Sequence, residues 1–267
     1  MALHIALCSI VQQGLENLLN SIKKVPSVQR LVLTSSSVAC GQPVAVPRSK
    51  FDPSKPLKTF TPDTWDDEMP KWTAEQTELQ KQGKQKPEDQ GKMTMACYAT
   101  GKILAEKAAW KWIEDNDPKL TFTTVHPNAT LGSPILKGGK ASVPGDWIWD
   151  VYKGNSDVYG AVLPQWFSNV EDIATAHVAA IADDNVGNER ILAFNGMFGW
   201  NDISRSLQKS FPDQKVAPLQ QGDDDTVDGT RVENQRYDEI CGGKLKSLDE
   251  SLKGTIEGLI RTGAKQA

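Results

Sequence analysis

The chain has 267 residues, of which 39% are hydrophobic, 24% are charged and 7% are aromatic. Such a composition is typical of a globular protein and excludes a collagen-like or wholly disordered chain. The 30 basic and 34 acidic residues give a formal net charge of -4, so the chain as a whole does not attract nucleic acid or an anionic membrane surface. We therefore expect neither a nucleic-acid partner nor a membrane partner.

Four cysteines, Cys8, Cys40, Cys97 and Cys241, are scattered along the chain. Because no two of them stand close together in sequence, their spacing predicts neither a zinc site nor a redox pair, and we expect no metal. Isolated cysteines are typical of a reducing compartment. The apolar residues at the N-terminus lack a preceding basic segment, so a signal peptide is not expected and a cytoplasmic location is predicted.

The first predicted elements lead to a cluster of hydroxyl groups. Residues 3–24 carry apolar side chains at spacings of three and four, which predicts a helix. The short apolar run 30–33 is typical of a strand that is buried on both faces in a parallel sheet. It continues directly into the run 34–37, Thr-Ser-Ser-Ser. Open α/β sheets bind ligands at the carboxyl ends of their strands, so these hydroxyls are site candidates; hydroxyls that cap a turn are the alternative.

The region 42–93 has a different composition. It carries six prolines before Lys71 and then a stretch rich in Gln, Lys and Glu over 73–92. This composition predicts a long polar loop with one polar helix, much of it mobile.

Helices and strands alternate over the rest of the chain, which indicates an α/β fold with a parallel sheet. A Gly- and Pro-rich loop (128–146) and an irregular stretch (154–169) interrupt this alternation. We expect helices over 98–116, 147–153, 170–183, 200–211 and 247–262, and strands over 120–126 and 190–194.

Tyr98 and Lys102 stand four residues apart within a predicted helix, so they lie one turn apart on the same face. An ammonium group beside a phenol stabilises the phenolate, which allows the phenol to give and take a proton near neutral pH. An exposed helical pair without chemistry is the alternative, and the spacing alone favours it. The upstream hydroxyls favour a catalytic pair, because a second hydroxyl at the same sheet edge can bind a substrate carbonyl oxygen.

Four sequence blocks occur in the order in which they stand in a known family. Together they resemble the extended short-chain dehydrogenase/reductases, and among these the dihydroflavonol-reductase-like branch that includes fungal and yeast NADPH-dependent aldehyde and ketone reductases. The resemblance extends over almost the whole chain. The blocks are Arg30-Leu-Val-Leu-Thr-Ser-Ser-Ser37, Tyr98-Ala-Thr-Gly-Lys-Ile-Leu-Ala-Glu-Lys-Ala-Ala-Trp110, His126-Pro-Asn-Ala-Thr-Leu-Gly132 and Val170-Glu-Asp-Ile-Ala-Thr-Ala-His177.

The resemblance implies an oxidoreductase that reduces the carbonyl group of a small aldehyde or ketone with NADPH, NAD being possible. In that family pattern Ser36 polarises the carbonyl, Tyr98 is the general acid, and Lys102 supports Tyr98 and holds the nicotinamide ribose. His126 is assigned no role. The implied cofactor-binding residues are Thr34, Ser35, Tyr98, Lys102, Pro127, Asn128 and Leu131, and the implied substrate-binding residues are Ser37, Val162 and Gln165.

The chain departs from the family at its beginning. The family opens with a strand, a Gly-rich turn and a helix that hold the cofactor pyrophosphate, whereas no G-x-G-x-x-G occurs here. We therefore expect a partial Rossmann-like parallel sheet without its first strands, about 90 family residues being absent, and weak binding of NADPH. Residues 1–135 would be the remainder of the dinucleotide-binding domain. Residues 136–267 would be mainly a small substrate-binding region, with a strand near 190–194 returning to the sheet.

Two other functions stay open at this point. The chain could be a catalytically inactive paralogue that acts as a binding or regulatory protein, or a sugar epimerase or hydroxysteroid dehydrogenase on the same scaffold. The retained Ser36, Tyr98 and Lys102 argue against the inactive paralogue. The sequence does not predict an oligomeric state.

Overall fold

The computed structural model describes residues 13–116 and 119–266. The chain divides into two compact units that alternate along the sequence. The first consists of residues 1–42, 62–126 and 178–191, and the second of residues 43–61, 127–177 and 192–267. The predicted division into residues 1–135 and 136–267 stays a prediction. The assignment of one half to cofactor and the other to substrate stays a prediction.

A three-stranded sheet with the order β1-β4-β7 forms the framework of the first unit. Strand β1 (Arg30–Thr34) pairs in parallel with β4 (Thr121–Pro127), and β7 (Arg190–Ala193) begins in this unit. These strands confirm the three that the apolar runs predict. The expectation that β1 is buried on both faces is wrong, because its residues are only partly buried. Within the described residues β1 is an edge strand, and one side of it has no neighbouring strand.

Helix α4 (Met93–Asn116) carries the apolar contacts that hold this sheet. Residues 13–22 form a second helix, which confirms the later part of the predicted helix 3–24; the earlier part lies outside the described residues. The buried side chains of both helices meet the sheet in one hydrophobic cluster, so the burial of apolar surface fixes α4 on the sheet. The buried members of that cluster are Leu15, Leu19, Ala105, Ala109, Ile113, Leu120 and Phe122.

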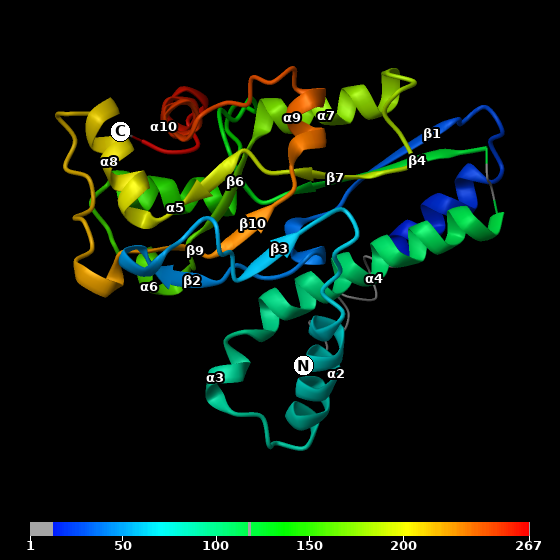
Figure 1. The fold of residues 1–267 in the computed structure, drawn as a ribbon, viewed down its shortest axis with the longest axis horizontal. Coiled ribbons are helices and arrows are strands. Elements are labelled where there is room, and N and C mark those ends of the chain that lie inside the picture. Colours follow the sequence, from blue (N-terminus) through cyan, green and yellow to red (C-terminus); the bar gives the residue numbers. More distant parts are fainter. Residues whose placement is uncertain (1–12, 117–118, 267) are drawn as a thin grey trace. The chain divides into compact units, whose positions relative to one another are not determined.

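The polar region 42–93 contains more regular structure than its composition predicts. The predicted polar helix is α2 (Glu68–Lys81), and the short helix α3 (Pro87–Gln90) follows it. Helix α2 lies beside α4, which begins five residues before the predicted start, and α3 stands on the connection between them (Figure 1). The contact is partly polar, because Thr100 Oγ1 of α4 donates a hydrogen bond of 2.9 Å to Thr73 Oγ1 of α2. Mean composition does not reveal such a contact.

Short strands that the sequence does not predict form the sheets of the second unit. One three-stranded sheet has the order β5-β6-β8, and two pairs join β2 with β9 and β3 with β10. Most of these strands have only three residues, too few for a recognisable alternation of apolar side chains. Their bounds are β2 (Ala45–Pro47), β3 (Lys58–Phe60), β5 (Ala129–Leu131), β6 (Gln165–Asn169), β8 (Gly196–Phe198), β9 (Thr226–Asp228) and β10 (Thr230–Val232).

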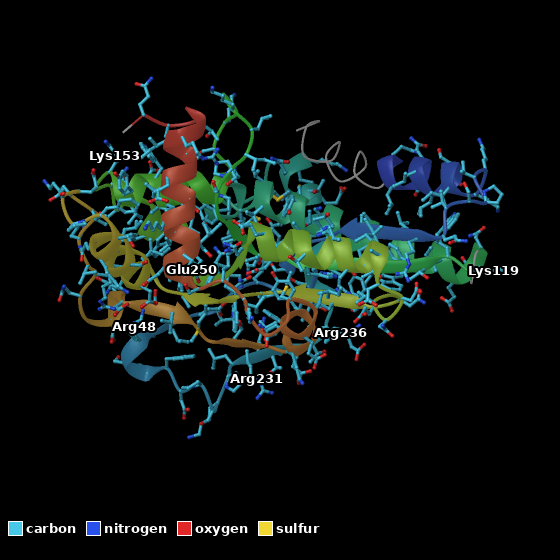
Figure 2. All side chains as sticks on the ribbon, turned by 90° about the horizontal axis from the view of Figure 1, so that it is seen from above. Arg48, Lys119, Lys153, Arg231, Arg236 and Glu250 are labelled. Atoms are coloured by element: carbon cyan, nitrogen blue, oxygen red, sulfur yellow. The ribbon has the colours of Figure 1, made fainter. Side chains whose placement is uncertain are left out.

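Helices α5 (Val143–Tyr152), α8 (Trp200–Ser210) and α10 (Leu248–Thr262) pack against one another around the apolar core of the second unit. Ser247 begins α10 with a reciprocal capping box to Glu250, which Figure 2 labels near the start of that helix. Gly263 ends α10 at φ 74°, a left-handed conformation that favours glycine. The remaining segments are α6 (Val158–Ala161), α7 (Val170–Ala182), which runs on into the first unit, α9 (Gln235–Ile240), η1 (Ser37–Ala39), η2 (Arg48–Lys50) and η3 (Gly222–Asp224).

Over residues 13–116 and 119–266, no helix combines the length and the apolar character that crossing a membrane requires.

Candidate functional site

The carboxyl end of β1 delivers three buried serines in a row. The backbone N–H of Ser35 donates to the carbonyl oxygen of Val125 over 2.8 Å, which extends the pairing of β1 with β4 by one residue. Ser36 has extended backbone geometry and begins the 3₁₀ helix η1, of which Ser37 is the first residue. The side chains of all three serines are buried. The hydroxyl cluster therefore stands at the strand end where the sequence places it.

Tyr98 and Lys102 lie one turn apart on α4, in the same unit as this strand end. The Lys102 ammonium donates a hydrogen bond of 2.9 Å to the carbonyl oxygen of Thr34, which ties the helix to the last residue of β1. Tyr98 is 41% exposed, so solvent and small molecules reach its side chain. The structure thus joins Lys102 directly to the predicted strand end and leaves the phenol accessible.

Burial lowers the pKa of Lys102 from its ordinary value of 10.5, because a charged ammonium is less well solvated there than in water. The negative charge of Glu106, one turn further along α4, acts in the opposite direction and raises that pKa. Tyr98, Lys102 and Glu106 stand at intervals of four residues and follow one face of the helix. The environment of the ammonium therefore depends on the state of Glu106.

Glu106 is the centre of a buried hydrogen-bond network that the sequence analysis did not predict. Its side chain is fully buried and accepts hydrogen bonds from Ser35 Oγ at 2.6 Å and from Thr124 Oγ1 at 3.0 Å. Arg190 Nε donates to Oε1 over 2.8 Å, and His126 Nε2 lies 3.0 Å from the same oxygen. Burial raises the pKa of Glu106, but the hydrogen bonds and positive charges of His126 and Arg190 outweigh burial and lower it to about 2.

Arg190 and His126 connect this network to its surroundings. The guanidinium of Arg190 lies 3.8 Å from the centre of the Trp65 ring and donates to the carbonyl oxygen of Thr64 over 2.8 Å. His126 Nδ1 lies 3.2 Å from the carbonyl oxygen of Ser36. A carbonyl oxygen only accepts hydrogen bonds, so Nδ1 of His126 carries a proton and donates it.

The signal that could have revealed this network is the interval of four residues that joins Lys102 to Glu106. The other members are 18 to 84 residues away from Glu106 in sequence, so no local pattern connects them.

The predicted cofactor-binding residues at and just beyond the end of β4 belong to the second unit. Pro127 is the last residue of β4 and is partly buried. The Asn128 side chain accepts a hydrogen bond of 2.7 Å from the backbone N–H of Ala129. The backbone N–H of Asn128 donates to Ser168 Oγ over 2.8 Å. Leu131 is 2% exposed, belongs to the apolar core and is paired with Asn169 of β6, so its side chain packs internally and its role toward a cofactor stays a prediction.

The predicted substrate-binding residues Val162 and Gln165 also lie in the second unit. Val162 packs against the core, and its carbonyl oxygen accepts a hydrogen bond of 2.8 Å from Trp200 Nε1. Gln165, at the start of β6, is partly buried and donates to the carbonyl oxygen of Leu163 over 3.2 Å. Their roles toward a substrate stay predictions.

The arrangement in the first unit is suited to proton transfer at a polar double bond. It combines an accessible phenol, an ammonium one turn away and a hydroxyl-bearing strand end, which are the parts needed to bind a carbonyl oxygen and protonate it. No group of His, Cys, Asp and Glu that could hold a metal ion occurs among the residues that the structure describes.

Known proteins resemble the chain in both sequence and fold, although no family model matches it. The ketoreductase AdrE of Penicillium rubens is 30% identical over 248 residues, which are 91% of this chain and 66% of that protein. Aldehyde reductase 2 of Sporidiobolus salmonicolor is 26% identical, with the same two coverages. The chain spans about two thirds of the length of these relatives.

Among solved structures, yeast methylglyoxal/isovaleraldehyde reductase Gre2, complexed with NADPH, superposes with a TM-score of 0.70. It is 22% identical, and the match covers 96% of this chain and 71% of Gre2. Vestitone reductase from alfalfa has a TM-score of 0.65 at 16% identity, covering 97% of this chain and 73% of that protein. At these identities the likeness shows the fold, which is that of the Rossmann-type reductases.

The fold and the similar sequences together place the chain in the class of the short-chain dehydrogenase/reductases. Within this class, the chain belongs to the family of the fungal ketoreductases and aldehyde reductases. The resemblance noted in the sequence is thereby confirmed.

Proposed function

We propose that this chain carries the catalytic residues of an NADPH-dependent reductase that converts a small aldehyde or ketone into an alcohol. The observation that carries the proposal is the link between Lys102 and the end of β1, one helical turn from the accessible phenol of Tyr98. The relatives support it, because two of them are named ketoreductase and aldehyde reductase.

In the proposed reaction the three polar side chains act on the carbonyl oxygen. Ser36 donates a hydrogen bond to that oxygen, and Tyr98 transfers its phenolic proton to it as negative charge develops. Lys102 stabilises the phenolate that remains and returns Tyr98 to its protonated form with a proton from solvent. NADPH, when bound, supplies the hydride for the carbonyl carbon. Proton and hydride together balance the reduction.

The residues of the first unit fit one end of this cofactor. Lys102 holds its ammonium at the carboxyl end of a parallel strand, where α/β folds bind nucleotides, and can donate to ribose hydroxyls there. We propose that Thr34 and Ser35 line the same end. The 267 residues contain no Gly-rich turn for the pyrophosphate, so the fit extends to the nicotinamide ribose and not to the phosphates. NAD in place of NADPH remains compatible with these residues.

The proposal also covers the predicted residues of the second unit and the location of the protein in the cell. We propose that the nicotinamide is lined by Pro127, Asn128 and Leu131. The substrate would be bound by Val162 and Gln165, together with Ser37 of the first unit. Among the described residues, Cys40, Cys97 and Cys241 form no disulfide bond, which supports a reducing, cytoplasmic location.

An assay that follows NADPH oxidation directly tests the proposal. The chain is purified alone and also joined to a Gly-rich cofactor-binding segment from the ketoreductase relative, and each protein receives NADPH with a panel of aldehydes and ketones. We expect substrate-dependent loss of reduced nicotinamide absorbance in the fusion, and a decrease of about 10²- to 10⁴-fold in the matched variant Tyr98→Phe. A folded fusion that consumes no NADPH with any substrate would refute the proposal.

A further inference from the structure

Three consecutive residues at the end of β1 are each held by a different polar side chain. The Thr34 carbonyl accepts from Lys102, the Ser35 hydroxyl donates to Glu106, and the Ser36 carbonyl accepts from His126. The proposed catalytic serine therefore stands in a segment that is restrained at its own carbonyl oxygen, at the Ser35 hydroxyl and at the Thr34 carbonyl oxygen. Two of these restraints, through Ser35 and through His126, meet at the Glu106 carboxylate.

Charge explains why a carboxylate is needed at this place. Arg190 is buried with its Nε 2.8 Å from Glu106 Oε1, and Lys102 stands one turn away on α4. Without the negative charge, the Arg190 guanidinium would be buried with no carboxylate partner, which costs free energy. Within the first unit Glu106 is thus the counter-charge of Arg190 and a source of negative potential at Lys102.

We infer that Glu106 is a positioning residue of the proposed reductase: it fixes Ser36 through Ser35 and His126, and it places a negative charge one helical turn from Lys102. This inference rests on the proposed function, but Glu106 itself is placed against neither substrate nor cofactor. It predicts two effects that are measurable without turnover, namely the mobility of residues 34–41 and the titration of Lys102.

The distances allow two complementary variants. Glu106→Gln keeps the shape and the acceptor oxygen but removes the charge. Ser35→Ala removes a single hydrogen bond and leaves every charge in place. Glu114→Gln changes an exposed carboxylate two turns further along the same helix and is the matched control. All three are made in the full 267-residue chain.

The first measurement follows the Lys102 side chain by NMR in ¹³C-lysine-labelled protein, with its signal assigned by Lys102→Arg. In Glu106→Gln we expect the titration midpoint of Lys102 to fall by roughly half a pH unit or more, because an attractive charge has been removed. Ser35→Ala and Glu114→Gln should leave the midpoint unchanged. A general loosening of the fold would not distinguish the charged variant in this way.

The second measurement is amide hydrogen exchange over residues 34–41. We expect about tenfold faster exchange in Glu106→Gln and in Ser35→Ala than in Glu114→Gln, with unchanged exchange in the second unit. The inference is overturned if both variants match the control in exchange and the Lys102 midpoint does not move. Should Glu106→Gln fail to fold, unchanged exchange in Ser35→Ala overturns it.

Activity separates this inference from the proposed function. Where the fusion protein reduces a carbonyl substrate, Glu106→Gln should lower kcat by about 10- to 100-fold with little change in KM, since positioning affects the chemical step. A fusion that turns over nothing defeats the proposed function and leaves the titration and exchange results to decide the positioning role. An active fusion with unaltered Lys102 titration and exchange in the variants defeats the positioning role alone.

Discussion

Both units have an apolar core, and the first unit adds to it a buried, charged hydrogen-bond network around Glu106. In the first unit a buried carboxylate accepts hydrogen bonds from Ser35, Thr124 and Arg190 and contacts His126. In the second unit the interior is an apolar cluster of aliphatic and aromatic side chains between α5, α8 and α10. Hydrogen bonds and ion pairs depend on direction and distance, whereas apolar burial depends mainly on area. We therefore expect the unit with the proposed catalytic residues to hold its side chains in defined positions and to tolerate fewer substitutions in its interior.

The largest expected effect comes from removing the carboxylate altogether. Glu106→Ala leaves Arg190 and His126 buried without their partner, and breaking a buried ion pair on one side should cost about 4 kcal/mol of unfolding free energy. Urea denaturation measures it, with Glu114→Ala as the exposed control. A loss below about 1 kcal/mol would mean that the network contributes little and would remove the contrast between the units.

Acid should weaken the first unit through the same residue. The folded state lowers the pKa of Glu106 from 4.5 to about 2, so its stabilisation is complete above pH 4.5 and is lost as the pH falls through about 2. The full effect is about 3 kcal/mol. The free energy of unfolding is measured as a function of pH for the wild type and for Glu106→Gln. The difference between the two curves separates the contribution of Glu106 from that of the other carboxylates. Parallel curves for the two proteins between pH 5 and 2 would contradict it.

An apolar truncation tests the second unit. Leu252 on α10 is completely buried, and Leu252→Ala should cost about 3 kcal/mol by leaving a cavity, whereas Leu252→Met should cost less than about 1.5 kcal/mol. Urea denaturation again measures both, with the exposed neighbour Lys253→Ala as control. Equal losses for Ala and Met would show that this core is as shape-dependent as the polar network.

The smallest expected effect is at a helix cap. Ser247→Ala removes the side chain that accepts from Glu250 N at 3.3 Å, and the loss should be about 1 kcal/mol. Ser247→Asp keeps an acceptor at the same place and should retain most of the stability. Thermal unfolding of Ser247→Ala, Ser247→Asp and the wild type checks this. Equal melting temperatures for Ser247→Ala and the wild type would show that the cap contributes nothing to stability.

The sequence predicted the elements with strong periodicity or continuous apolar runs. Helix 98–116, the strands 30–33 and 120–126 and the helix 247–262 all occur, with ends shifted by a few residues. It did not predict the three-residue strands of the second unit, because so short a strand has no measurable alternation. It also missed α3, a four-residue helix without a buried side chain, and the first five residues of α4, although Met93, Ala96 and Cys97 are buried there.

The candidate site was predictable only in part. Tyr98 and Lys102 are marked by their spacing, and Ser36 by its place at a strand end. Glu106 follows the same spacing, but its partners Arg190 and His126 come from other strands, and only the pairing of β1, β4 and β7 brings them together. Three-dimensional partners of this kind leave no trace in local periodicity.

The restraints at the end of β1 have a consequence for changes in chain length. Side chains alternate along a strand, so one residue inserted before Ser35 would turn its hydroxyl away from Glu106 and shift Ser36 off its partner. The exposed turn between α2 and α3, where Gly83 adopts φ 67°, carries no such contact at its tip. Insertions and deletions should therefore be accepted at this turn and rejected a few residues upstream of η1, within the same unit.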